Sequence, residues 1–175
     1  MNALYLGNAV CFLASVLMTL IGFIKVKKRF LLAQSGMNAL FIAGNLLLGG
    51  IAGALTNAMT MLRNFYLLRR GMGRGAKLFF IALHLLLGAV FRVEGLIAWF
   101  PILGACLLTW CMDSEDMVLF KGIFVLFQLL CAVYDASIRN YATVPFDLAA
   151  AVTNGVALVS ILRERKRAAA EEKPV

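Results

Sequence analysis

Residues 54–58 (ALTNA) read against residues 151–155 (AVTNG) at an offset of 97 residues. Each stretch carries an asparagine, Asn57 or Asn154, that directly follows a threonine inside a long apolar run. The same offset pairs Leu6-Gly7 with Leu103-Gly104, so two anchors 49 residues apart recur with equal separation in both halves. This pattern indicates an internal repeat, which is a common way of building membrane transporters.

The composition is that of a membrane protein. The chain has 175 residues, of which 62% are apolar and 15% are charged, whereas a soluble domain has about 25% charged residues. Apolar stretches close to the length of a bilayer span follow one another with short breaks. The net charge of +8 resides in the segments between these stretches, where basic residues set topology. We therefore expect the lipid bilayer, and no nucleic acid, as a partner.

Hydropathy and glycine breaks predict seven helices. Their ranges are roughly 3–24, 30–48, 51–68, 76–92, 95–111, 117–135 and 146–162. The least marked break is Arg92-Val93-Glu94, and a continuous helix there would reduce the count to six. Seven is favoured because an odd number keeps the C-terminal RERKR run on the same side as the other basic loops. Residues 168–175 are expected to form a disordered tail.

The basic loops also predict orientation. Lysines and arginines cluster at residues 25–29, 69–77 and 163–167, which lie at the same side of a seven-helix layout. The positive-inside rule then places the N-terminus outside and the C-terminus in the cytoplasm.

The offset and the helix count together predict an all-α membrane protein with a three-plus-one-plus-three layout. Residues 1–70 form a first triple-helix bundle, residues 76–92 a linker transmembrane helix, residues 95–163 a second triple-helix bundle, and residues 164–175 a cytoplasmic tail. Because each bundle has an odd number of helices, the extra crossing makes the two repeats parallel.

Two asparagines are the leading candidates for a binding site. Measured from repeat-matched helix starts, Asn57 and Asn154 lie about 12 Å deep, near the middle of a bilayer. An amide there must face protein or water, so the pair either lines a pocket or forms interhelical hydrogen bonds. Polar residues on neighbouring helices would be further substrate contacts: Asn38, Asn45 and Gln128. The candidate aromatic walls of the site are Trp110 and Tyr134.

The remaining polar residues are expected to be structural. Arg63 lies near enough to a helix end for its side chain to snorkel to water, although a charge inside a span is also a functional candidate. His84 is expected to be a packing residue. Glu94, Asp135 and Asp147 are expected at solvated helix ends, with attraction of cations towards an outer mouth as the alternative. The four cysteines fall inside predicted spans without metal-ligand spacing, so we expect free thiols, no metal and no cofactor. Catalytic motifs are absent from the sequence, which argues against an enzyme.

Several of these residues also carry a resemblance. The stretch Asn38-Ala39-Leu40-Phe41, the following Leu47-Leu48-Gly49, and Asn57, together with Thr109-Trp110, Tyr134-Asp135 and Asn154, resemble the YgjV-type family of bacterial inner-membrane proteins over residues 4–165. The resemblance implies a bacterial inner-membrane location. The layout is also similar to that of the SWEET and PQ-loop carriers, in which an asparagine on the third helix of each bundle faces the substrate.

Two functions remain open from the sequence. The first is a carrier of SWEET-like layout that moves a small polar solute, since an amide offers both donors and an acceptor to an uncharged ligand. The alternative is a structural or accessory membrane protein whose polar stripes only hold the helices together. Either protein could assemble as a homo-oligomer.

Overall fold

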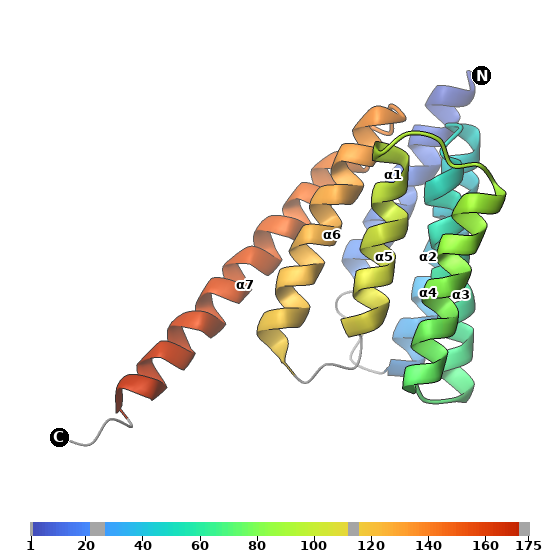
Figure 1. The fold of residues 1–175 in the computed structure, drawn as a ribbon. Coiled ribbons are helices and arrows are strands. Elements are labelled where there is room, and N and C mark those ends of the chain that lie inside the picture. The colour runs from blue at the N-terminus through green and yellow to red at the C-terminus, as the bar shows by residue number, and fades with distance from the viewer. Residues whose placement is uncertain (1, 22–26, 112–115, 172–175) are drawn as a thin grey trace.

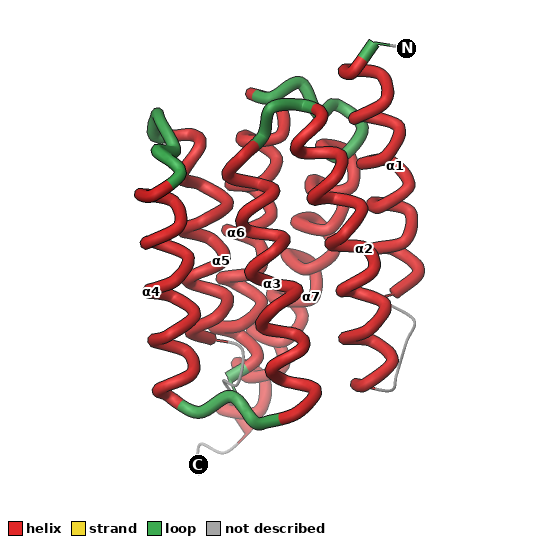
Figure 2. Tube along the Cα trace, turned by 90° about the vertical axis from the view of Figure 1, so that its right-hand side faces the viewer, coloured by secondary structure: helices red, strands yellow, loops and turns green. Residues whose placement is uncertain are grey.

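The described residues form seven α-helices that alternate in direction. The structure is a computed structural model, and it describes residues 2–21, 27–111 and 116–171. Figures 1 and 2 show the arrangement. The helices are α1 Ala3–Ile21, α2 Lys27–Leu47, α3 Ile51–Arg69, α4 Arg74–Val90, α5 Phe100–Cys111, α6 Met117–Ser137 and α7 Val144–Glu171, with a 3-10 turn η1 Ile97–Trp99 before α5. The predicted count of seven helices is confirmed.

The break between α4 and α5 has a clear physical cause. Arg92 adopts a left-handed conformation with φ of 48°. Its N–H bonds to the Ala89 carbonyl, and the Val93 N–H bonds to the Gly88 carbonyl at 3.0 Å. These two bonds form a Schellman motif, which satisfies the last carbonyls of a helix and ends it. A continuous helix over residues 76–111 is thereby excluded.

The α2–α3 and α6–α7 turns close in the same way. Gly49 and Arg139 are left-handed, with φ of 75° and 61°. The N–H of the next residue then donates to a carbonyl in the last turn of the preceding helix. Gly50 donates to Asn45 at 2.7 Å, and Asn140 donates to Asp135 at 2.8 Å. Three tight turns of one type therefore lie at the end of the molecule where α1 begins, which we call the N-terminal end. They bring the ends of α2 and α6 close to the starts of α3 and α7.

The C-terminal segment departs from the prediction. Helix α7 begins at Val144 and continues to Glu171, nine residues beyond the expected end at residue 162. The extension is rich in arginine, lysine, glutamate and alanine, which are strong helix formers. The expected disorder is therefore wrong for residues 168–171, and residues 172–175 lie outside the described part, as does the expected end of the first helix at residue 24.

Helices that follow one another in sequence pack side by side. The extensive pairs are α1–α2, α2–α3, α3–α4, α4–α5, α5–α6 and α6–α7, and α5 also packs against α3. Helix α7 lies along α6 and contacts α1 near its start, where the Phe12 and Phe146 rings meet edge to face at 5.9 Å. Farther along, α7 diverges from α1 to α5 and its C-terminal end projects outward (Figure 1), while Arg165 still bonds to Asp116 at the start of α6.

Three helices are long and apolar enough to cross a membrane. They cover Ala3–Leu20, Met117–Ser137 and Val144–Arg167, and Leu31–Leu47 and Ile97–Cys111 are shorter apolar helices. The interior of the described part holds many polar side chains, while large apolar side chains such as Leu86, Phe79 and Val156 are exposed. This inversion of a soluble protein's pattern suits a surface that faces lipid.

Candidate functional site

Polar side chains from α2, α3 and α6 meet around Gly53, near the N-terminal end. The Tyr134 hydroxyl accepts a hydrogen bond from the Gly53 N–H at 2.9 Å, and Asn57 donates to the Gly53 carbonyl at 2.8 Å. A Cβ atom at Gly53 would come within 2.6 Å of Asn45 Oδ1. Glycine is therefore required here, because a side chain would prevent α2 from packing this closely against α3. We call Asn45, Gly53, Asn57 and Tyr134 the Gly53 cluster.

The Gly53 cluster has unused hydrogen-bonding capacity. Asn45 is buried, and its amide nitrogen donates to the Phe41 carbonyl of its own helix at 2.9 Å. Its Oδ1 atom has no partner. Two turns along the same face of α2, Asn38 is only 2% exposed and its Nδ2 atom also lacks a partner. An unpaired acceptor and an unpaired donor on one face could both serve an uncharged polar ligand.

A second polar group adjoins this cluster at the α6–α7 turn. Asn140 donates to Asp135 Oδ1 at 3.2 Å, and the Asp135 and Asp147 carboxyl groups are in hydrogen-bonding contact. Both aspartates are buried, so the expectation that they sit at solvated helix ends is wrong. Two charged carboxylates in contact repel each other, so this arrangement is stable when the two groups share one proton or bind a cation.

Sequence reasoning missed Asn140 and Thr143 as members of this group. Both are buried, and each has an oxygen without a partner. A polar residue in a short turn normally faces water, so the only available signal was the closeness of Asp135 and Asp147 to one turn. Helix α1 covers this turn through Asn8. The Asn8 Oδ1 atom accepts a hydrogen bond from the Ala142 N–H at 3.1 Å, and its Nδ2 atom donates to the Arg139 carbonyl at 3.0 Å.

The structure does not bring Asn154 to the Gly53 cluster. Asn154 lies on α7, where its amide donates to the Ala150 carbonyl at 2.8 Å and its Oδ1 accepts from Lys121 Nζ at 2.7 Å. Helices α3 and α7 do not form an extensive pair among the described residues. Asn57 is six residues after Ile51, the first residue of α3, whereas Asn154 is ten residues after Val144, the first residue of α7. The two amides therefore lie at different depths in their helices, and not at the equal depth that the repeat predicts.

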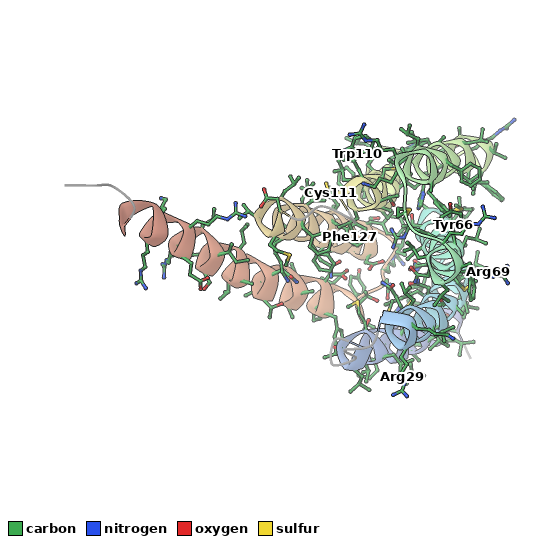
Figure 3. The ribbon with its side chains drawn as sticks, turned by 90° about the horizontal axis from the view of Figure 1, so that it is seen from below. Arg29, Tyr66, Arg69, Trp110, Cys111 and Phe127 are labelled. Carbon is green, nitrogen blue, oxygen red and sulfur yellow. The ribbon has the colours of Figure 1, made fainter. Side chains whose placement is uncertain are left out.

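Gln128 and Trp110 also lie apart from the Gly53 cluster. Gln128 is buried on α6, two turns before Asp135 on the same face. Trp110 is 53% exposed and points away on the side of α5 opposite α7 (Figure 3). Its carbonyl accepts from Lys77 Nζ at 3.0 Å, and the Lys77 ammonium lies 5.8 Å from the centre of its ring. Trp110 therefore forms no wall around Asn57 in this structure.

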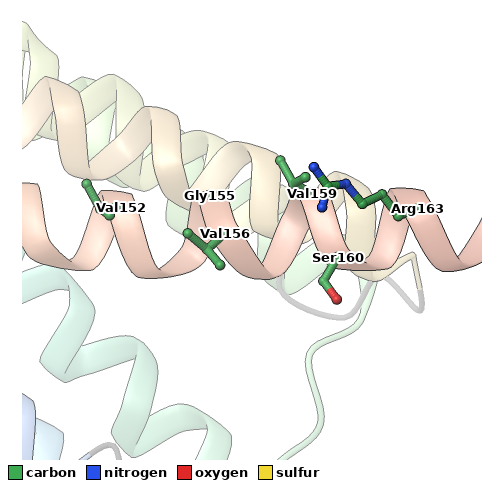
Figure 4. A pocket seen from close by; sticks show the side chains of 6 residues that line it. All are labelled: Val152, Gly155, Val156, Val159, Ser160 and Arg163. Carbon is green, nitrogen blue, oxygen red and sulfur yellow. The ribbon is translucent and has the colours of Figure 1, made fainter.

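An open groove follows the exposed side of α7. It has a volume of about 640 Å³ and is shown in Figure 4. Its lining is mainly apolar: Val152, Gly155, Val156, Val159, Ser160 and Arg163. A second cavity of about 570 Å³ lies at the far end of α3, beside Tyr66 and Arg70. Neither is lined by a residue of the Gly53 cluster, and the apolar lining of the first suits lipid chains better than a polar solute.

Within the described residues, no three or more histidine, cysteine, aspartate or glutamate side chains are placed to hold a metal ion. The four cysteines are free thiols, as the sequence predicts. The chemistry available near the Gly53 cluster is thus hydrogen bonding by amides and a phenol, next to a carboxyl pair that can share one proton.

Comparison with known proteins places the chain in a family. The model of the Imp-YgjV family, described as bacterial inner membrane protein, matches residues 5–165. No curated protein and no solved structure matches the chain. The family match covers all seven helices except the ends of α1 and α7, and the apolar outer surface agrees with the membrane location that it describes. The chain therefore belongs to the Imp-YgjV family of bacterial inner membrane proteins.

Proposed function

We propose that this inner-membrane protein carries a small, uncharged or weakly charged polar solute, and that the Gly53 cluster binds it. The observation that carries the proposal is Asn45 Oδ1, a buried acceptor without a partner beside Tyr134 and Gly53. A buried acceptor left unpaired is costly, and the hydroxyl or amide N–H of a solute would satisfy it. Asn57, Asn38 and Gln128 would extend the path along the helices.

The proposed carrier crosses the membrane seven times in a SWEET-like layout. Helices α1–α3 and α5–α7 would be the two bundles, α4 the linker, and Asn154 the counterpart of Asn57. The N-terminus would lie outside and the C-terminus in the cytoplasm, since the basic residues cluster at the end opposite the N-terminal end. The bilayer and the solute are the partners, and the exposed apolar surface leaves room for a second copy.

A ligand screen with matched variants tests the proposal. Polyols, sugars and small amides would be added to the purified protein, because a ligand that binds only the native state raises the melting temperature. A solute that shifts wild type should not shift Tyr134→Phe, which loses only the hydroxyl. Tyr141→Phe is the control, since Tyr141 is 64% exposed. A response that is equal in both variants would exclude the Gly53 cluster as the binding site.

A structural or accessory role is the second candidate. It is favoured by polar side chains that join one helix to another. Asn154 accepts a hydrogen bond from Lys121 on α6, and Asn8 joins α1 to the α6–α7 turn, while Asn57 uses its amide on a carbonyl of its own helix. In this case Asn57→Ala should lower stability by about 1–2 kcal/mol at most without a binding defect. A carrier should instead lose its ligand response while it stays folded.

A further inference from the structure

Arg63 is a buried cation at the junction of three helices. It lies on α3 and is only 5% exposed. Its Nη1 atom donates to Thr109 Oγ1 on α5 at 3.1 Å, and Thr109 itself donates to the Ala105 carbonyl at 2.7 Å. The side chain therefore points between α3, α4 and α5. The expectation that Arg63 snorkels to water is wrong.

No carboxylate in the described residues forms an ion pair with Arg63, and its Nε atom has no hydrogen-bond partner. A guanidinium cannot lose its proton in a protein, so it cannot become neutral in response to burial. A buried charge without a partner is strongly unfavourable. The protein thus supplies one hydroxyl to a group with five N–H donors, and a ligand that carries negative charge would complete the site.

His84, on the neighbouring helix α4, provides a second buried atom without a partner. It is on α4 and 2% exposed, and its Nδ1 lies 2.8 Å from the Phe80 carbonyl. A carbonyl only accepts hydrogen bonds, so Nδ1 carries a proton, and in the neutral ring Nε2 then presents a lone pair. Nε2 is buried without a partner. The Arg63 guanidinium is near enough to interact electrostatically with the ring.

We infer that Arg63, with Thr109 and His84, binds a small oxyanion that also bears a hydroxyl group. The oxyanion would accept from the free guanidinium N–H groups, which match carboxylate and phosphate geometry. The ligand's hydroxyl would donate to His84 Nε2. The Tyr66 and Phe80 rings, 5.7 Å apart and edge to face, pack between α3 and α4 beside this position.

This site is separate from the Gly53 cluster. Arg63 lies ten residues beyond Gly53 on α3, which is about 15 Å along the helix. It is formed with α4 and α5, whereas the Gly53 cluster is formed with α2 and α6. The inference consequently goes beyond the proposed function, and either could stand without the other. Two sources offer the same chemistry: a free hydroxycarboxylate and the phosphoglycerol head group of an anionic lipid.

The test measures melting temperature for the full chain in neutral detergent. Sodium glycolate should raise the melting temperature saturably and by more than acetate, which lacks the hydroxyl, with chloride at equal ionic strength as the reference. Arg63→Gln should abolish the response. Arg69→Gln, an exposed arginine on the same helix, should retain it. His84→Leu should respond equally to glycolate and acetate.

A lipid arm identifies the source of the oxyanion. Phosphatidylglycerol would be added in place of phosphatidylcholine to the same micelles. An Arg63-dependent shift with this lipid but not with glycolate assigns the site to a head group, and a shift with glycolate assigns it to a free solute. No Arg63-dependent shift with glycolate, acetate or phosphatidylglycerol would overturn the inference.

Stability without added anions gives an independent measure. Arg63→Gln removes a buried unpaired charge, so it should melt at the same temperature as wild type or higher. A clearly lower melting temperature would mean that the protein itself satisfies Arg63, and would also overturn the inference. Tyr134→Phe should keep the glycolate response, which separates a failure at Arg63 from a failure of the proposed solute site.

Discussion

Helices α3 and α7 hold corresponding places in the predicted repeat, yet they have opposite surroundings. Helix α3 packs against α2, α4 and α5, and it buries Thr56, Arg63 and Asn64. Among the described residues, α6 is the one helix against which α7 packs extensively, and Thr153 is exposed where Thr56 is buried. Similar sequence thus produces a similar local bond, from each asparagine to its own helix, but not a similar site. Of these two helices, α3 faces the polar interior with several buried polar side chains, whereas α7 contributes Asp147 near its start.

The largest contrast should appear in core packing. Met59 on α3 is 1% exposed and Val156 on α7 is 67% exposed. Met59→Ala should lower the free energy of unfolding by about 2–5 kcal/mol through lost contacts and a cavity. Val156→Ala should change it by no more than about 0.5 kcal/mol. Denaturant unfolding in detergent measures both, and equal effects would mean that α7 is packed in the membrane as α3 is.

Glycine substitutions should show a smaller difference in stability between the two helices, again with the destabilising change on α3. A Cβ at Gly53 meets Asn45 Oδ1 and the Tyr134 ring, whereas one at Gly155 meets nothing within 4 Å. Gly53→Ala should destabilise the protein by about 1–3 kcal/mol through overpacking. Gly155→Ala should stabilise it by up to about 1 kcal/mol, because alanine favours the helix. If Gly53→Ala left stability unchanged, α2 and α3 would have to be packed less tightly around Gly53 than the 2.6 Å approach to Asn45 Oδ1 implies.

The bond between Asn154 and Lys121 should contribute less again. A double-mutant cycle with Asn154→Leu and Lys121→Met isolates their interaction. Interhelical hydrogen bonds in membranes average about 0.6 kcal/mol, and we expect that value here. A coupling of zero would mean that this contact does not hold α7 against α6, and would leave the two helices joined mainly by apolar packing.

The smallest effect should be a pH dependence at the other end of the α6–α7 pair. Arg165 lies 2.8 Å from Asp116, and this hydrogen bond lowers the pKa of Asp116 below its ordinary value. The stabilisation is therefore present above the ordinary aspartate pKa and is lost as pH falls through the lowered value. Because both side chains are about half exposed, the loss should be slight. Arg165→Gln should remove this acid-side slope, and an unchanged slope would assign it elsewhere.

Much of the fold was predictable because it depends on local signals. Apolar runs, glycine breaks and the parity of the basic loops predicted all seven helices, including the break at Arg92. The sequence also singled out Asn45, as part of a polar stripe, and Tyr134, as an aromatic wall; both are buried, and their role as solute contacts stays a prediction.

The parts that were not predictable depend on long-range packing. The residues around Arg63 in the sequence are the same whether its side chain snorkels to water or is buried. Its burial depends on Thr109, which lies on another helix. Asp135 and Asp147 are buried because α1 covers their turn through Asn8. The length of α7 was missed for a different reason: its charged end resembles a tail by composition, although its residues favour a helix.

Thiol labelling at position 57 tests most directly whether α3 lines a polar, solute-accessible interior. The four native cysteines would be replaced, Asn57→Cys introduced, and intact membranes treated with a small water-soluble thiol reagent. If α3 lines a polar interior, this thiol should react, and a solute identified by the thermal screen should slow the reaction. Leu62→Cys, at an exposed apolar position on the same helix, should stay unreactive because it faces lipid. An unreactive thiol at position 57 would contradict the carrier, because a dry interior cannot pass a polar solute.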